Sequence, residues 1–117
     1  MHNEQPYLNL GALLEKSGHV EEAIPVLARA STIAPNSAKT RYQLAKAYFD
    51  LSHFEDARQQ AEKAVSLDPA ESSDHYLLGR IYQRSGKSDL AKEQFRITEQ
   101  LIHSKASNST GMASGMR

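Results

Sequence analysis

The sequence of 117 residues contains no cysteine and carries no surplus of charge of either sign. Without cysteine the chain has neither disulfides nor thiolate ligands for a metal, and its redox compartment is left open. Lys plus Arg and Asp plus Glu number 14 each, a balance that does not favour nucleic acid or an anionic membrane as the partner. The remaining composition, 39% apolar and 24% charged, is typical of a soluble helical protein.

Long apolar runs are also missing. No stretch reaches the roughly 18 apolar residues of a membrane span, and the N-terminus lacks the basic-then-apolar pattern of a signal peptide. We therefore expect no membrane insertion, and a cytoplasmic location is favoured while the compartment itself stays unknown. The chain also has no glycine-rich phosphate loop, no HExxH and no recognisable Ser-His-Asp set. We predict no enzyme activity, no catalytic residue and no cofactor.

The histidines and the basic residues do not form a specialised site either. His19 and His53 stand at equivalent positions, but no third ligand accompanies them, so we interpret them as solvated turn residues and expect no metal. Helical repeats that bind RNA need a strongly basic face. Glu15 and Asp50 interrupt the basic positions here, and no nucleic-acid partner is expected.

The chain does contain an internal period of 34 residues. The equivalent positions include Leu10, Leu44 and Leu78; Ala23, Ala57 and Ala91; and Pro35 and Pro69. The period divides the chain into a lead-in (1–3), three units (4–37, 38–71 and 72–105) and a tail (106–117). A fixed period of this size indicates a repeat architecture before local propensity is considered.

Each unit predicts two amphipathic helices joined by a short turn. In the second and third units, helices are predicted over 38–51, 54–67, 74–85 and about 88–103. Gly18 and Gly86 stand where a residue of positive φ can end a helix, whereas Ser52 replaces them in the middle unit and predicts the least relaxed turn. The tail is small, polar and without periodicity, and it is predicted to be disordered.

Residue size also repeats. Small residues recur at Gly11, Ala45 and Gly79, and large ones at Leu10, Leu44 and Leu78 and at Leu14, Tyr48 and Tyr82. This pattern resembles the tetratricopeptide repeat, a 34-residue helix–turn–helix unit with a closing proline. The resemblance covers about 4–105. It departs at the aromatic position early in the first helix, where Tyr7 is followed by Arg41 and His75 in the later units.

The resemblance implies an all-α, right-handed superhelix (a solenoid) of six helices, whose first helices line a concave peptide-binding face. On a helical wheel, Tyr42, Lys46 and Asp50 lie roughly opposite Leu44 and Ala45. The predicted groove residues are Lys39, Tyr42, Lys46, Phe49, Asp50, Tyr76, Arg80, Gln83 and Arg84. Aromatic rings beside cations suit an extended peptide with an acidic group. The alternative interpretation is a solvated amphipathic surface.

Some members of this family hold the acidic C-termini of heat-shock chaperones in a carboxylate clamp of Lys, Asn, Asn, Lys and Arg. The matching positions here are Leu8, Ala12, Gln43, Ser73 and Leu77. The clamp is absent, which disfavours a cochaperone role.

The leading hypothesis is a non-catalytic scaffold that binds a short, acidic segment of a partner protein. The alternative is a structural, assembly or accessory segment that acts through its apolar ends within a larger multidomain protein. That larger protein could be an enzyme encoded upstream, to which this chain is an accessory domain. Leu13 has no preceding unit, and Leu90, Leu101 and Ile102 have no following helix. The chain is therefore expected to be the last part of a longer array, or to self-associate through its ends.

Overall fold

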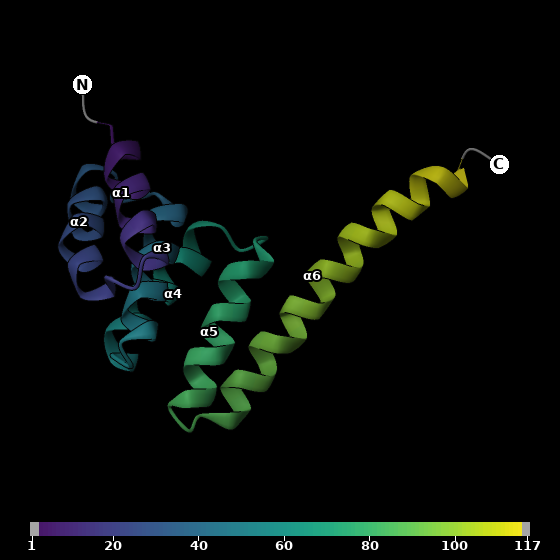
Figure 1. Ribbon diagram of the computed structural model, residues 1–117. Helices are drawn as coiled ribbons and strands as arrows, with labels where there is room; N and C mark the ends of the chain where they lie inside the picture. Colours follow the sequence, from purple (N-terminus) through teal and green to yellow (C-terminus); the bar gives the residue numbers. More distant parts are fainter. Residues whose placement is uncertain (1–2, 116–117) are drawn as a thin grey trace.

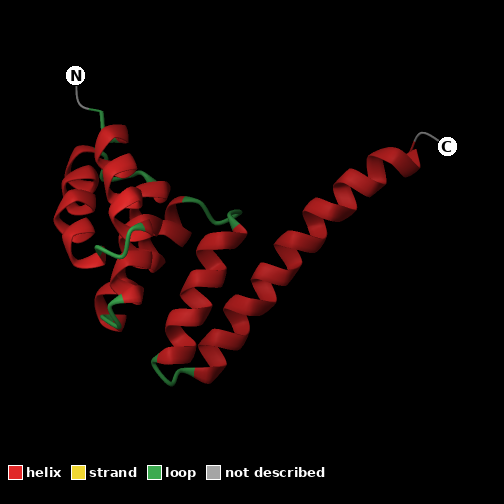
Figure 2. Cartoon of the chain, in the orientation of Figure 1, coloured by secondary structure: helices red, strands yellow, loops and turns green. Residues whose placement is uncertain are grey.

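The computed structural model describes residues 3–115, and within this range every regular element is an α-helix (Figures 1 and 2). The helices are α1 (Gln5–Lys16), α2 (Val20–Ile33), α3 (Ala38–Asp50), α4 (Phe54–Leu67), α5 (Ser72–Arg84) and α6 (Ser88–Gly115). They form three helix–turn–helix pairs, and the described chain measures 52 × 40 × 25 Å. The prediction of an all-α solenoid is confirmed.

The α3 and α5 helices begin in different ways. Ser37 caps α3, because its hydroxyl accepts a hydrogen bond from the backbone N–H of Thr40 at 3.2 Å. At α5 the cap is Glu71, whose carboxylate accepts from the N–H of Ser73 at 3.5 Å. The helix therefore begins at Ser72, two residues before the predicted start.

Each of the three turns that join the helices of a pair contains a residue with positive φ. Gly18, Ser52 and Gly86 have φ of +84°, +61° and +78°. Glycine adopts this left-handed region freely, whereas the Cβ of serine is crowded there. The prediction that the turn at Ser52 is the least relaxed is confirmed.

Small residues let the two helices of a pair approach closely. A Cβ added to Gly79 of α5 would lie 2.6 Å from Cε1 of Phe95 on α6, and one added to Gly11 of α1 would overlap the side chain of Leu27 on α2. Ala23, Ala57 and Ala91 are almost fully buried on the second helices. Side chains from the facing helix fill the space that these residues leave, as the repeated pattern predicts.

Apolar contacts also join successive pairs. Leu44 and Ala47 of α3 belong to one buried cluster with Leu27 of α2, and Ile81 of α5 is fully buried. Leu10 stands at the same position of the period as the buried Leu44, but it is 46% exposed because no helix precedes α1 in the described part of the chain. Burial at this position depends on the neighbouring unit rather than on the residue itself.

A polar cluster ties the second unit to the first. Arg41 replaces the aromatic residue that the family pattern places early in the first helix. Its guanidinium donates two hydrogen bonds to the carbonyl oxygen of Pro35, at 3.2 and 3.0 Å, and a third to the side chain of Gln60, at 3.0 Å. Arg41 thus links α3 to its own α4 and to the closing proline of the preceding unit.

The third unit repeats this cluster with a different side chain. His75 is 5% exposed; its Nε2 donates to the carbonyl oxygen of Pro69 at 2.7 Å, and its Nδ1 lies 2.7 Å from the side-chain amide of Gln94. Proline and glutamine stand 34 residues after their counterparts in the second unit. Arg41 and His75, the two departures from the family pattern, therefore make equivalent hydrogen bonds in their units, where the family pattern has an aromatic residue.

The C-terminal tail differs from its prediction. Residues 106–117 were expected to be disordered, but α6 is helical as far as Gly115 and extends away from the other helices (Figure 1). Residues 116–117 lie outside the described range. The physical reason is that His103 stands where the other units have their closing proline, so no residue there removes a backbone hydrogen-bond donor and ends the helix.

Candidate peptide-binding groove

Three hollows lie along the first helices of the units, and we call them together the groove. One of about 420 Å³ lies between α1 and α3 and is lined by Ala12, Glu15 and Lys46 among others. One of about 350 Å³ lies between α3 and the start of α5. The third, of about 230 Å³, lies between α3, α5 and α6. Of the predicted groove residues, Lys39, Tyr42, Lys46 and Tyr76 line these hollows. The other five line none of the three: Phe49, Asp50, Arg80, Gln83 and Arg84.

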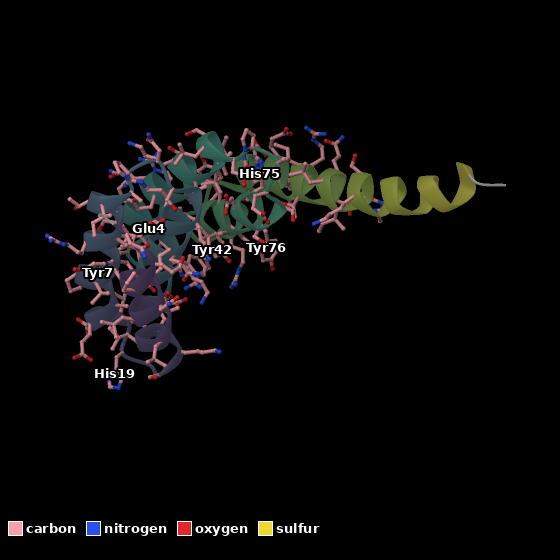
Figure 3. All side chains as sticks on the ribbon, turned by 90° about the horizontal axis from the view of Figure 1, so that it is seen from above. Glu4, Tyr7, His19, Tyr42, His75 and Tyr76 are labelled. Atoms are coloured by element: carbon pink, nitrogen blue, oxygen red, sulfur yellow. The ribbon has the colours of Figure 1, made fainter. Side chains whose placement is uncertain are left out.

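Tyr42 and Tyr76 line the third hollow together, and Figure 3 shows them beside each other. Tyr76 is 51% exposed, and its ring packs at 5.7 Å from that of Phe95. Tyr42 is half-buried and also lines the second hollow. The structure thus brings the two predicted tyrosines together in one hollow, where each ring is partly covered and partly open to solvent.

Phe49 is not a groove residue, contrary to the prediction. It is 8% exposed and belongs to the core cluster, with the ring of Phe54 at 5.8 Å. The guanidinium of Arg80 covers its other side at 4.9 Å from the ring centre. The wheel placed Phe49 at the edge of the polar stripe, where packing from α4 and α5 decides whether a residue is covered.

Arg80 and Arg84 are held over these aromatic rings. Arg84 lies 5.8 Å from the ring centre of Phe49 and 5.2 Å from that of Phe54. Both arginines are exposed, and within the described chain neither forms an ion pair. Gln83, also exposed, stands between them in sequence. A stacked guanidinium keeps its N–H donors free for a carboxylate while its position is restricted.

Lys46 is engaged by a neighbour. Its Nζ lies 3.8 Å from Oε2 of Glu15, whose side chain is only 4% exposed. Burial raises the pKa of Glu15; the charge of Lys46 opposes this shift, and that of Asp50 adds to it. Lys46 therefore compensates a buried carboxylate on α1, while Asp50 itself is exposed at the end of α3.

The second hollow is acidic, which the helical wheel did not predict. Lys39 and Tyr42 of α3 line it, but so do Asp68, Glu71 and Asp74 from the α4–α5 connection and the first turn of α5. Burial, together with the charges of Glu71 and Asp68, raises the pKa of Asp74 to about 6. The wheel treats one helix at a time and omits loops, whereas the spacing of three acids within 68–74 was a visible signal.

The acids of the second hollow also act on Tyr42. Its pKa is raised chiefly by burial and then by the negative charges of Asp74, Glu15, Glu71 and Asp50. The hydroxyl of Tyr42 therefore stays protonated and can donate a hydrogen bond at neutral pH. A ligand at this part of the groove meets a negative potential, in contrast to the positive one at Arg80 and Arg84.

Two further properties concern the described residues as a whole. No three histidine or carboxylate side chains among them gather closely enough to hold a metal ion. None of their helices is both long enough and apolar enough to cross a membrane.

Comparisons with known proteins give consistent results. Two family models, each described as Tetratricopeptide repeat, match residues 14–74 and 75–96. The chain is similar to anaphase-promoting complex subunit 3 of Schizosaccharomyces pombe, with 27% identity over 88 residues, 75% of this chain and 13% of that protein. It spans about one eighth of the length of the curated relatives it matches.

Solved structures share the fold. A double mutant of MamA from Desulfovibrio magneticus RS-1 superposes with a TM-score of 0.85 at 31% identity, over 90% of this chain and 59% of that one. The second TPR domain of Spaghetti (RPAP3), bound to the HSP90 peptide SRMEEVD, superposes with a TM-score of 0.81 at 24% identity, over 84% and 91% of the two chains. The latter likeness concerns the fold alone.

Proposed function

Because the chain belongs to the tetratricopeptide repeat family, we propose that it is a non-catalytic interaction module whose groove binds a short, extended segment of a partner protein. A protein–protein interaction scaffold is the general role that this fold supports. The domain of RPAP3 with the same fold holds a peptide that contains acidic residues. The chaperone clamp is absent here, so the partner of this chain is recognised by other side chains.

The observation that carries the proposal is the placement of Tyr76, Arg80 and Arg84 on successive turns of α5. The tyrosine offers a rigid, half-exposed ring beside Tyr42. The two arginines are positioned over Phe49 and keep their hydrogen-bond donors available. Arginine binds carboxylates through two parallel hydrogen bonds, so an acidic side chain of the segment is expected at this end of the groove.

The proposal can be tested by selecting binders from a displayed library of random dodecapeptides and measuring their dissociation constants by fluorescence anisotropy. We expect binding to fall at least about tenfold in the double variant Tyr42→Ala/Tyr76→Ala, as for aromatic anchors in other interfaces. Charge reversal in Arg80→Glu/Arg84→Glu should weaken peptides that carry an acidic residue. Reversal at Lys46 should have less effect, because this lysine already faces Glu15.

The control is Arg96→Glu, a charge reversal on an exposed arginine of α6 that pairs with Glu93 and, unlike Arg80 and Arg84, does not stack on Phe49. It should leave peptide binding unchanged. A library from which no peptide is selected, or whose peptides bind the double tyrosine variant as tightly as the unaltered chain, would contradict the proposed groove.

A second candidate function rests on the two ends. Leu13 of α1 is 60% exposed, and Leu90 and Ile102 of α6 are 50% and 55% exposed. Apolar side chains of this size on terminal helices are covered by neighbouring units in longer arrays. If the ends associate, light scattering should give a mass above 13.0 kDa that Leu90→Lys returns to the monomer value. Leu90 is the suitable site because it lines none of the three hollows, whereas Leu13 lines the first and Ile102 the third. A monomer at all concentrations would contradict self-association.

A further inference from the structure

The second hollow of the groove combines one aromatic ring with three carboxyl groups. It lies between α3 and the start of α5 and has a volume of about 350 Å³. Tyr42 enters from α3, Asp68 and Glu71 from the α4–α5 connection, and Asp74 from the first turn of α5. The size is that of a pocket for one long side chain rather than for a folded element.

Asp74 is the unusual member of this group. It is only 4% exposed, yet within the described chain no hydrogen-bond donor and no cation pairs with its carboxylate. Its neighbours Glu71 and Asp68 are also negative and oppose its ionisation. Among the described residues, the enclosed side-chain oxygens without a hydrogen bond are those of Glu15, whereas the carboxylate of Asp74 opens into the hollow. A largely buried carboxylate without a partner costs stability.

The position of Asp74 in the first turn of α5 does not account for this burial. A carboxylate there interacts favourably with the positive end of the helix dipole. Asp56 and Asp89 have this interaction in the first turns of α4 and α6, and both are exposed. Burial of Asp74 adds a desolvation cost, and interaction with the helix dipole does not require this burial.

Glu15, a second buried carboxylate, differs from Asp74 in that a cation lies near it. The side chain of Glu15 is 4% exposed and neither of its oxygens accepts a hydrogen bond within the described residues, but Nζ of Lys46 lies 3.8 Å from Oε2. Lys39 lines the hollow of Asp74, yet it is exposed and forms no ion pair within the described residues. Within the described chain, the buried carboxylate of the first hollow has an ion pair and that of the second has none.

A metal ion does not fit the second hollow, because the described residues assemble no group of three carboxylates or histidines close enough to bind one. A lysine or arginine side chain does fit. Its positive head can donate to Asp74 while Glu71 and Asp68 add negative charge to the hollow, and its apolar stem can lie on the ring of Tyr42.

We infer that this acidic pocket binds a lysine or arginine side chain of the segment that the groove holds, with Asp74 as the central acceptor. The inference rests on the proposed function and specifies its ligand. The segment then carries opposite charges: a basic residue at Asp74 and an acidic one at Arg80 and Arg84. Asp74 and Arg80 are six residues apart, at least about 9 Å along the axis of α5, so at least about three residues of extended chain separate the two charges.

The test uses peptides selected from the dodecapeptide library, the full chain and two isosteric variants. Asp74→Asn removes the charge of the pocket, and Asp56→Asn makes the same change at an exposed aspartate of α4 that lines none of the hollows. Each selected peptide is also synthesised with its basic residue replaced by glutamine. Dissociation constants are measured for all combinations, and circular dichroism checks that each variant is folded.

We expect the selected peptides to contain a lysine or arginine at least three residues from an acidic residue. Asp74→Asn should weaken their binding about tenfold, Asp56→Asn should not, and the glutamine peptides should bind the unaltered chain and Asp74→Asn equally. Peptides that bind without a basic residue, or that bind Asp74→Asn with unchanged affinity, would overturn the pocket while leaving the groove intact. The absence of any selected peptide would overturn both.

Discussion

The α5 helix carries two sets of side chains that differ in where their partners lie. His75, Gly79 and Tyr82 are buried, and each meets a group within the chain: a carbonyl oxygen and an amide, an aromatic ring, and the carboxylate of Glu62 at 2.6 Å. Asp74 lines the second hollow, Arg80 and Arg84 lie exposed over Phe49, and none of the three forms an ion pair inside the described chain. The first set stabilises the fold, whereas the second leaves charges available for another molecule.

The largest effect on stability is expected at His75. The substitution His75→Ala removes two hydrogen bonds and leaves the carbonyl oxygen of Pro69 and the side chain of Gln94 without this partner. Unsatisfied buried groups cost about 1–3 kcal/mol each, so the free energy of unfolding should fall by about 3 kcal/mol. Urea denaturation measures this change. A loss below about 1 kcal/mol would show that the cluster does not link the units.

Gly79→Ala should have the next largest effect. The added Cβ would lie 2.6 Å from Cε1 of Phe95, so the ring or the two helices must move. Overpacking of this kind costs about 1–3 kcal/mol, and we expect a loss of about 2 kcal/mol in urea denaturation. Gly79→Ala combined with Phe95→Leu should recover part of it, because the smaller side chain relieves the contact. Equal stability of the single variant and the unaltered chain would contradict close packing here.

Asp74→Asn should act in the opposite direction and depend on pH. Because the pKa of Asp74 is raised from 3.8 to about 6, folding favours its protonated form, and this contribution to stability is lost as the pH rises through about 6. At about pH 8 the uncharged asparagine should therefore stabilise the chain by about 1 kcal/mol, which corresponds to about 5 °C in Tm. At about pH 4 the two chains should melt alike. Equal Tm values at both pH values would contradict an uncompensated charge.

The smallest effect on stability is expected at the arginines. Arg80→Glu/Arg84→Glu removes only the contacts of exposed cations with Phe49 and Phe54. Such contacts contribute about 0.5–1 kcal/mol at exposed sites, so thermal melting should change little while acidic-peptide binding falls. A loss of stability as large as that of His75→Ala would place the arginines among the residues that hold the fold.

The architecture followed from the sequence because a period of 34 residues repeats both size and polarity. Positions such as Leu44 and Ala57 face a neighbour at the same point in each unit, so their burial could be predicted without coordinates. The residues that depart from the prediction lie in the first and last helices of the described chain. Leu10 is exposed for want of a preceding helix, and α6 continues to Gly115 for want of a closing proline.

The candidate groove was predictable only in part, for a physical reason. A helical wheel places Tyr42, Tyr76 and Arg80 correctly on one side of their helices, because that requires only the geometry of a single helix. It placed Phe49 there as well, since it does not include the side chains of α4 and α5 that cover it. It also missed the acids of the α4–α5 connection.

The helix pairs, their turns and their close contacts are thus properties of local sequence, repeated three times. The charges of the groove are different, because their burial and their partners depend on how neighbouring units pack against one another. Lys46 lies 3.8 Å from Glu15 in the first hollow, whereas Asp74 is buried in the second and forms no ion pair within the described chain. Coulomb interactions and desolvation vary with separation and burial in three dimensions, so only the packed arrangement of the units distinguishes a compensated carboxylate from one that can receive a ligand.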